Sequence, residues 1–155
     1  MSLPKDTYII VSVGIWNDEG KFMMVEEGKE WVRGLWNFPS GKAEMNETLV
    51  EGAKREVLEE TGCVVEITDL SGIYHYTDDK KSEAFVRVCF NCKLISENPE
   101  AVLESDILSR AWKTREEVEE LIAQGKIRSK IAEKAIEQYF AGASYPIEVI
   151  KELEF

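Results

Sequence analysis

Alternating apolar and polar stretches predict the order of elements in the first part of the chain. A β-branched run at 8–16 predicts a core strand, the polar residues 17–20 predict a turn, and 21–25 predict a second strand. These two strands are expected to form a hairpin. Residues 26–46 show little periodicity, and they predict a long loop or a short strand within one.

The clearest helical pattern covers residues 47–61. Its apolar residues fall within an arc of about 100° at 3.6 residues per turn, and they are Leu49, Val50, Ala53 and Val57. Gly62 follows, and glycine is the residue type that most often ends a helix.

The second half of the chain predicts three strands and then two helices. Apolar runs predict strands at 64–77, 84–95 and 107–113, the first two joined by a polar turn. Thr114 and Glu117 have the spacing of a capping box for a helix at 115–123. A further helix is predicted at 128–140, and the tail at 147–155 is ambiguous. This order predicts a mixed β-sheet with helices packed on it, in an α/β or α+β domain.

Composition narrows the class of protein. The chain has 155 residues, 44% of them hydrophobic, and a net charge of −11. Its length suits one domain with a real core, and its aromatic and aliphatic content argues against disorder. The acidic excess disfavours binding to long nucleic acid. No segment has the roughly 18 apolar residues needed to cross a membrane, and residues 1–6 are too polar and short for a signal peptide.

The three cysteines are interpreted as unpaired thiols. Cys89 and Cys92 form a C-x-x-C, a spacing found in redox and zinc sites. A zinc ribbon needs a second such pair, and the only other cysteine is Cys63. Residues three apart in a strand point to opposite faces, so Cys89 shares a face with Arg87, and Cys92 shares the other with Phe90. We therefore expect reduced thiols in a cytoplasmic protein.

Three glutamates share one face of the predicted helix at 47–61. Glu56 is three residues from Glu59 and four from Glu60. Like charges at this spacing destabilise a helix by about 0.2–0.5 kcal/mol per pair, and partial burial near Ala53 increases the cost. A divalent cation that prefers oxygen ligands would remove the repulsion. The alternative is a solvated acidic face on which Arg55 pairs with neighbouring glutamates.

The spacing from Gly41 to Cys63 decides between these interpretations. It reads G-x5-E-x7-R-E-U-x-E-E-x-G-U, where U is apolar, and Cys63 fills a position where an aliphatic residue is commoner. This pattern resembles the Nudix box. Residues 36–44 before the box and Ala111-Trp112 after it extend the resemblance over most of the chain. The resemblance implies a Nudix-type α/β/α sandwich with a mixed β-sheet, as a single domain at 4–155 with the box at 41–63.

The resemblance also implies an activity and a cofactor. Members of this family hydrolyse a nucleoside diphosphate linked to another group X, and they use Mg²⁺ or Mn²⁺. An ion pair between Glu47 and Arg55 is expected to orient the helix. The implied metal ligands are the backbone carbonyl of Ser40 and the carboxylates of Glu44, Glu56, Glu59 and Glu60.

A carboxylate must accept the proton of the attacking water. In MutT-like members this residue can lie six positions before the late tryptophan, which here is Asp106 counted from Trp112. Glu104 lies near enough in sequence to compete, and Glu59 of the box is the third catalytic candidate.

Other residues are candidates for contact with the substrate. Arg33 and Lys42 could bind phosphates, because their cationic heads are directional donors, or remain solvated. Three aromatic side chains could stack on a base or belong to the core or rim: Trp31, Trp36 and Phe38. His75 is the only histidine, and we interpret it as a structural or solvent-facing strand residue.

Residues outside the box lack the patterns typical of NADH, ADP-ribose, diadenosine polyphosphate and coenzyme A hydrolases. The short chain and its loop at 42–48 resemble those of MutT-like nucleotide-pool enzymes. This resemblance implies hydrolysis of a (d)NTP to NMP and pyrophosphate. The alternatives are an ADP-ribose or nucleotide-sugar pyrophosphatase and a Nudix-fold module that binds nucleotides without hydrolysis. The expected partner is a small nucleotide, with neither long nucleic acid nor membrane. Many members are dimers, so a homodimer is also an expectation.

Overall fold

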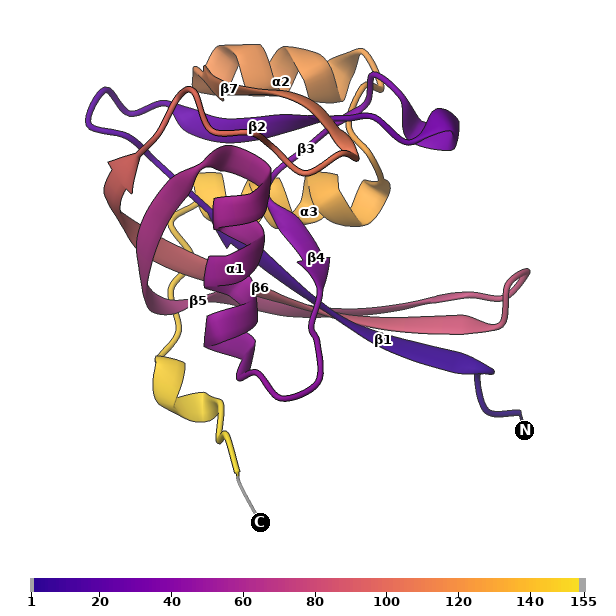
Figure 1. Cartoon of the computed structure of the whole chain (residues 1–155). Helices are drawn as coiled ribbons and strands as arrows, with labels where there is room; N and C mark the ends of the chain where they lie inside the picture. Colours follow the sequence, from indigo (N-terminus) through magenta and orange to yellow (C-terminus); the bar gives the residue numbers. More distant parts are fainter. Residues whose placement is uncertain (1, 154–155) are drawn as a thin grey trace.

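Two β-sheets form the framework of the protein in a computed structural model that describes residues 2–153 (Figure 1). The four-stranded sheet has the order β4-β1-β6-β5. Its strands are β1 (Asp6–Gly14), β4 (Ser40–Lys42), β5 (Cys63–Asp78) and β6 (Glu83–Glu97). β1 runs parallel to β6 while the other neighbours are antiparallel, which confirms a mixed sheet. The second, antiparallel sheet has the order β3-β2-β7, formed by β2 (Phe22–Glu27), β3 (Trp36–Asn37) and β7 (Ile107–Lys113).

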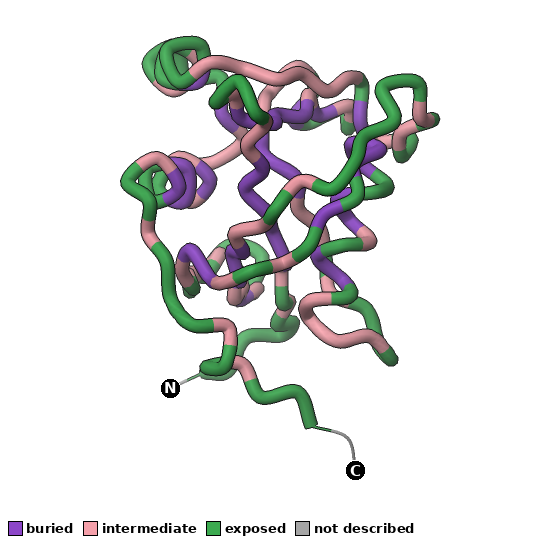
Figure 2. The backbone as a smooth tube through the Cα atoms, turned by 90° about the vertical axis from the view of Figure 1, so that its left-hand side faces the viewer, coloured by how far each residue is buried: buried purple, intermediate pink, exposed green. Residues whose placement is uncertain are grey.

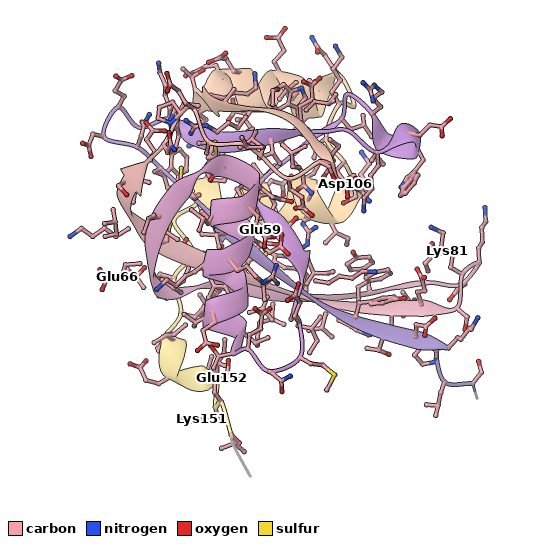
Figure 3. All side chains as sticks on the ribbon, in the orientation of Figure 1. Glu59, Glu66, Lys81, Asp106, Lys151 and Glu152 are labelled. Atoms are coloured by element: carbon pink, nitrogen blue, oxygen red, sulfur yellow. The ribbon has the colours of Figure 1, made fainter. Side chains whose placement is uncertain are left out.

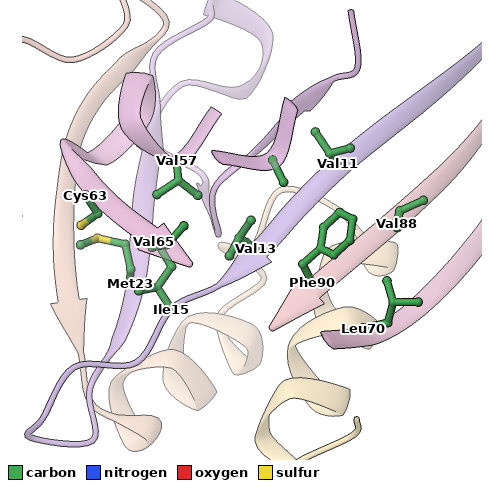
Figure 4. Packing of buried hydrophobic residues seen from close by; sticks show 11 residues of the cluster. Val11, Val13, Ile15, Met23, Val57, Cys63, Val65, Leu70, Val88 and Phe90 are labelled. Atoms are coloured by element: carbon green, nitrogen blue, oxygen red, sulfur yellow. The ribbon is translucent and has the colours of Figure 1, made fainter. Parts of the chain in front are cut away.

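Helices cover both faces of the four-stranded sheet. Helix α1 (Leu49–Thr61) packs on one face, where Val57 meets Val13, Val65 and Phe90 in a buried cluster (Figure 4). Helices α2 (Arg115–Ala123) and α3 (Lys130–Phe140) enclose a second cluster that contains Cys89. The successive residues Cys89 and Phe90 thus face different cores, and the buried residues concentrate between the layers (Figure 2). The expected α/β/α sandwich is confirmed.

The predicted hairpin at 8–25 is wrong, although its turn exists. Trp16 and Phe22 form an isolated antiparallel bridge, and the Met23 N–H donates to the Ile15 carbonyl at 2.9 Å. Beyond these contacts β2 leaves to pair with β7 in the other sheet. The reason is that both edges of β1 are occupied, one by β4 and the other by β6. A pattern of apolar residues predicts a strand, but it does not predict which other strand pairs with it.

Local signals at both ends of α1 agree with the structure. Thr48 is the N-cap, and its side chain forms a capping box with Glu51, so the helix begins at Leu49 rather than at 47. Gly62 ends it with φ of 73°, and its N–H donates to the Leu58 carbonyl at 3.0 Å. A Cβ on Gly62 would lie 2.6 Å from the Asn98 carbonyl oxygen, so both the backbone conformation and the space require glycine.

The remaining elements follow the predictions closely. The strands predicted at 64–77, 84–95 and 107–113 and the helix at 115–123 are present, and the last helix begins at Lys130 after the N-cap Ser129. The weakly periodic segment 26–46 contains β3, β4 and the 3-10 helix η1 (Glu30–Val32).

The ambiguous tail packs against the start of α1. It contains the 3-10 helix η2 (Ile147–Val149), and a Glu152 carboxylate oxygen accepts the Leu49 N–H at 2.8 Å. Residues 154–155, which the domain prediction included, lie outside the described residues. Within 2–153, no helix combines the length and the apolar character that a membrane crossing requires.

Candidate metal centre and active site

A cavity of about 450 Å³ opens beside the second half of α1. This volume lies within the range of about 300–1,000 Å³ that is usual for small-molecule sites. Glu56 and Glu60 reach it from α1, Glu104 and Asp106 from the loop before β7, and Glu27 from the end of β2. Residues from three separate parts of the chain therefore place carboxylates around one space.

Three of these carboxylates form a compact cluster. Oxygen atoms of Glu56, Glu60 and Glu104 all lie within 4.8 Å of one another. Glu56 and Glu60 are buried, and they project from successive turns of α1. Glu104 is exposed, and its N–H donates to the Glu59 carbonyl at 2.8 Å, which fastens its loop to the helix. Three close carboxylates with oxygen donors fit the preferences of Mg²⁺ and Mn²⁺.

Neighbouring backbone holds the two buried carboxylates in place. The Ser40 N–H donates to Glu60 Oε1 at 3.0 Å. Ser40 pairs with Ser12 across β4 and β1, so its backbone is extended, and serine at this position costs no backbone strain. Gly41 follows it, and a Cβ there would collide with the Glu56 carboxylate. The Glu56 carboxylate thus lies directly against the backbone of Gly41.

We expect Gly41→Ala to weaken Mn²⁺ binding by roughly 10- to 100-fold, the usual effect of disturbing the support of a metal ligand. The added methyl must displace the Glu56 carboxylate from the cluster. Isothermal titration with Mn²⁺ measures the change. Gly72→Ala is the matched control, because Gly72 lies in β5 outside this cavity and a Cβ there would lie 3.3 Å from the Tyr74 ring. Equal affinities for the two variants would contradict this placement of Glu56.

Burial shifts the acidity of the cluster. It raises the pKa of Glu56 to about 7, although hydrogen bonding and charge from Arg55 oppose the shift. Burial also raises the pKa of Glu60 well above its usual range, against the hydrogen bond from Ser40. The pKa of Glu104 is raised by burial and by the nearby charges of Glu59 and Asp106. A bound cation would remove this cost of holding the carboxylates ionised.

These shifts predict how the stability of the metal-free protein depends on pH. Folded Glu56 and Glu60 bind protons more tightly than the unfolded chain does, so the free energy of unfolding falls as the pH rises from about 4.3 towards 7. Urea unfolding in EDTA at several pH values measures this slope. Glu56→Gln/Glu60→Gln should be flatter than the wild type across that window, and identical slopes would contradict the shifts.

Arg55 joins the cluster to the start of the box. Its Nε and Nη2 donate to the two carboxylate oxygens of Glu47 at 2.9 and 2.8 Å, which is the expected ion pair in bidentate form. These hydrogen bonds lower the pKa of Glu47. Its Nη1 donates to Glu56 at 2.8 Å and to Glu59 at 3.3 Å. Glu51, one turn before Arg55 on the helix, belongs to the capping box with Thr48 instead.

The other carboxylates predicted for the site lie at its edge. Glu59 is exposed on α1 (Figure 3). It forms an ion pair with Arg55 at 3.3 Å and is not a member of the cluster of three. Glu44 lines the cavity, with its Oε1 3.5 Å from Arg55 Nη1. Asp106 also lines it, and its Oδ2 lies 3.6 Å from Lys29 Nζ.

The predicted substrate contacts divide into two groups. Lys42 lines the cavity, with its Nζ 4.0 Å from the centre of the Tyr8 ring. Arg33 is exposed, donates to the Gly28 carbonyl at 3.2 Å and is absent from the cavity lining. Trp36 is also absent from the lining, since it packs on the second core with Lys113 Nζ 4.4 Å from its ring.

The remaining aromatic candidates and the histidine also lie outside the lining. Phe38 is fully buried in the core, whereas Trp31 is exposed near Lys29. His75 is an exposed residue of β5, in agreement with its interpretation as a strand residue.

Several lining residues were missed by the sequence reasoning. Tyr76 and Phe85 stack with ring centres 4.8 Å apart and form an aromatic wall. Arg87 and Arg128 add positive charge. Arg87 could have been recognised as the single charge in the otherwise apolar stretch 84–90 of β6. The sequence around Arg128 did not predict a place in the cavity, because its partner Glu27, 3.4 Å away, is distant in the sequence.

Comparisons with known proteins identify the family of this chain. The model of the NUDIX domain family matches residues 7–134. Phosphatase NudJ from Escherichia coli K12 is 35% identical over 132 residues, which cover 85% of this chain and 83% of that protein. The solved NUDIX hydrolase from Nitrosomonas europaea is 30% identical, with a TM-score of 0.84 over 95% of this chain and 97% of that one. The MutT protein from Methanosarcina mazei Go1, at 22% identity, shares the fold with a TM-score of 0.72 over 91% and 99%. The chain therefore belongs to the Nudix hydrolase family, whose members act on phosphoric anhydride bonds.

Proposed function

We propose that this protein is a divalent-metal-dependent hydrolase of small nucleotides that converts a (d)NTP to NMP and pyrophosphate. The observation that carries the proposal is the cluster of Glu56, Glu60 and Glu104 in a cavity that also contains basic and aromatic side chains. Carboxylates alone would repel a polyphosphate. Carboxylates that hold a cation, together with lysine and arginine side chains, would instead present positive charge to a polyphosphate.

The metal would be held by Glu56 and Glu60, the two buried carboxylates of the cluster. Ser40, Glu44 and Glu59 remain the further ligands that the family resemblance predicts. When bound, Mg²⁺ or Mn²⁺ offsets the charge of the phosphate oxygens and lowers the pKa of a water molecule. Arg55 then has a separate task, because its hydrogen bonds to Glu47 and Glu56 fix the orientation of the helix face.

Geometry favours Glu104 over Asp106 as the acceptor of the water proton. The Glu104 carboxylate lies within the cluster, whereas that of Asp106 lies beside Lys29. A general base must reach the proton that it accepts, directly or through one water molecule. Glu104 also sits on a loop fastened to α1 by its N–H, so its carboxylate stays near the metal ligands. Asp106, the residue that the resemblance favoured, is the second candidate.

The aromatic wall supports a nucleotide substrate. Tyr76 and Phe85 come from adjacent strands, and their rings are only 11° from parallel. Flat aromatic surfaces at a cavity wall can stack a base, with a contribution of about 1–3 kcal/mol per base in single-stranded nucleic-acid binding. Phe85 lies between the rings of Tyr76 and Tyr8, so we assign the stacking role to Tyr76, in place of Trp36.

A second activity is favoured by the name of one group of relatives. Phosphatase NudJ is 35% identical to this chain, and a phosphatase releases orthophosphate. Cleavage at the terminal phosphate of a nucleoside di- or triphosphate would yield orthophosphate in place of pyrophosphate. The same cluster could serve both reactions, with the substrate shifted by one phosphate.

Product analysis separates these activities. Wild-type protein with Mg²⁺ is incubated with nucleoside tri- and diphosphates, ADP-ribose and a nucleotide sugar, and the nucleotide, pyrophosphate and orthophosphate products are quantified by chromatography. NMP and pyrophosphate from a triphosphate support the proposal, and NDP and orthophosphate support the second activity. If the wild type is as inactive as Glu59→Gln on every substrate, the hydrolase proposal fails.

A further inference from the structure

Arg87 occupies an unusual position for an arginine. It lies in the middle of β6, where it pairs with Ile10 of β1 on one side and Tyr74 of β5 on the other. Only 5% of its surface is exposed, yet its side chain lines the same cavity as the clustered carboxylates. A charged residue at the centre of a sheet, with both neighbouring strands in place, points into the cavity rather than out to bulk solvent.

The guanidinium group of Arg87 is unpaired. Its Nε and Nη1 are buried without a hydrogen-bond partner, and the described residues place no carboxylate within 4.0 Å of it. Its Cζ lies 5.4 Å from the centre of the Phe38 ring. This ring can make a cation–π contact, but it offers no hydrogen-bond acceptor. Arginine cannot lose its charge by deprotonation, so burial without a partner is costly. An oxyanion in the cavity would supply the negative charge that the guanidinium lacks.

Two further features add positive potential to this cavity. The 11-residue helix α3 begins beside it, with the N-cap Ser129 in the lining. A helix N-terminus favours a negative charge through its free N–H groups and its dipole. Arg128 also lines the cavity, although Glu27 already partners it at 3.4 Å. Among residues 2–153, Arg87 is the buried cation of this cavity that has neither a carboxylate nor a hydrogen-bond partner.

We propose that Arg87 and the N-terminus of α3 form an anion-binding subsite that holds a phosphoryl group of the substrate without help from the metal. The planar guanidinium offers two N–H donors to two oxygens of one phosphoryl group. The substrate would thus be held at two points, one phosphate at the metal centre and another on Arg87. The identity of the anion as a substrate phosphate rests on the proposed function, whereas the binding of an oxyanion does not.

Inorganic phosphate in EDTA tests the subsite without metal or catalysis. The melting temperature is followed as sodium phosphate replaces sodium chloride at constant ionic strength, because a ligand of the folded state raises it. We expect phosphate to raise the melting temperature of the wild type, and Arg87→Met to weaken phosphate binding by roughly tenfold or more. Arg115→Met is the matched control, because Arg115 lies on α2 outside the cavity and should leave the response unchanged.

A structural role for Arg87 would give the opposite pattern. If Arg87 only supports the sheet, Arg87→Met lowers the melting temperature and leaves the phosphate response intact. In the proposed subsite, removal of an unpaired buried charge raises the melting temperature in chloride. Arg87→Gln, which keeps a polar side chain, gives the same test if Arg87→Met does not fold. An equal phosphate response in wild type and Arg87→Gln would overturn the proposal.

Turnover measurements separate this inference from the proposed function. With Mg²⁺ and an active substrate, Arg87→Met should raise KM by roughly tenfold or more, since a contact to the bound phosphate is lost. If no nucleotide is hydrolysed by the wild type but phosphate still stabilises it through Arg87, the proposed function fails and the subsite stands. If the wild type hydrolyses nucleotides but phosphate in EDTA does not change its melting temperature, the proposed subsite is contradicted and the proposed function stands.

Discussion

Glu60→Gln is expected to lower kcat for hydrolysis of the preferred nucleotide by about a thousandfold. A catalytic metal supplies several kcal/mol of transition-state stabilisation, and each 1.4 kcal/mol corresponds to about a factor of ten. Glu60 is the buried carboxylate that the Ser40 N–H orients into the cluster. Glutamine has nearly the same shape, so the loss would come from the charge and the ligand oxygen. Steady-state kinetics at saturating Mg²⁺ measure it.

The same substitution should leave the metal-free protein at least as stable as the wild type. Burial disfavours the ionised form of Glu60, and glutamine removes that cost at neutral pH. Glu66→Gln is the control, because Glu66 is an exposed residue of β5 that does not line the cavity (Figure 3). Its activity and stability should match the wild type. Nearly full activity in Glu60→Gln would contradict its role as a ligand.

Arg55→Met is expected to lower the free energy of unfolding by about 3 kcal/mol at pH 7 in EDTA. Removal of one partner from a largely buried ion pair leaves the other charge uncompensated, which typically costs about 3–5 kcal/mol. Arg55 is partly exposed, so the lower end applies. Its loss leaves Glu47 and Glu56 without their main hydrogen-bond donor, and both carboxylates are mostly buried. Urea unfolding measures the change.

Arg115→Met provides the comparison for Arg55. Arg115 and its partner Glu119 are both exposed on α2, with Nε 2.9 Å from the carboxylate. An exposed pair of this kind contributes about 0.2–1 kcal/mol. A loss of stability in Arg55→Met no greater than in Arg115→Met would mean that Arg55 does not organise the box.

Local sequence signals were sufficient to predict the framework of the site. The N-cap Thr114, the stop at Gly62 and the apolar stripe of α1 depend on residues a few positions apart, so a single stretch of sequence contains the information. The spacing of the box likewise placed Glu56 and Glu60 on one face of the helix and predicted the pair of Glu47 with Arg55.

Contacts between distant segments could not be read from the sequence. The strand β1 pairs with β4 and β6. The apolar pattern of a strand does not predict which other strands pair with its edges. Glu104 joins the cluster in the position where helix spacing suggested Glu59, because the loop before β7 is fastened to the end of α1. The aromatic wall of Tyr76 and Phe85 arises from the register of β5 and β6, which one strand alone does not specify.

Mn²⁺ binding tests the central claim most directly, because the whole account depends on a cation held by the clustered carboxylates. Electron paramagnetic resonance of the free ion gives the affinity of the wild type and of Glu56→Gln/Glu60→Gln under the same conditions. We predict that the wild type binds Mn²⁺ and that the double variant loses more than about a hundredfold in affinity, beyond the usual effect of an outer-shell change. Equal affinities in the two proteins would contradict the account.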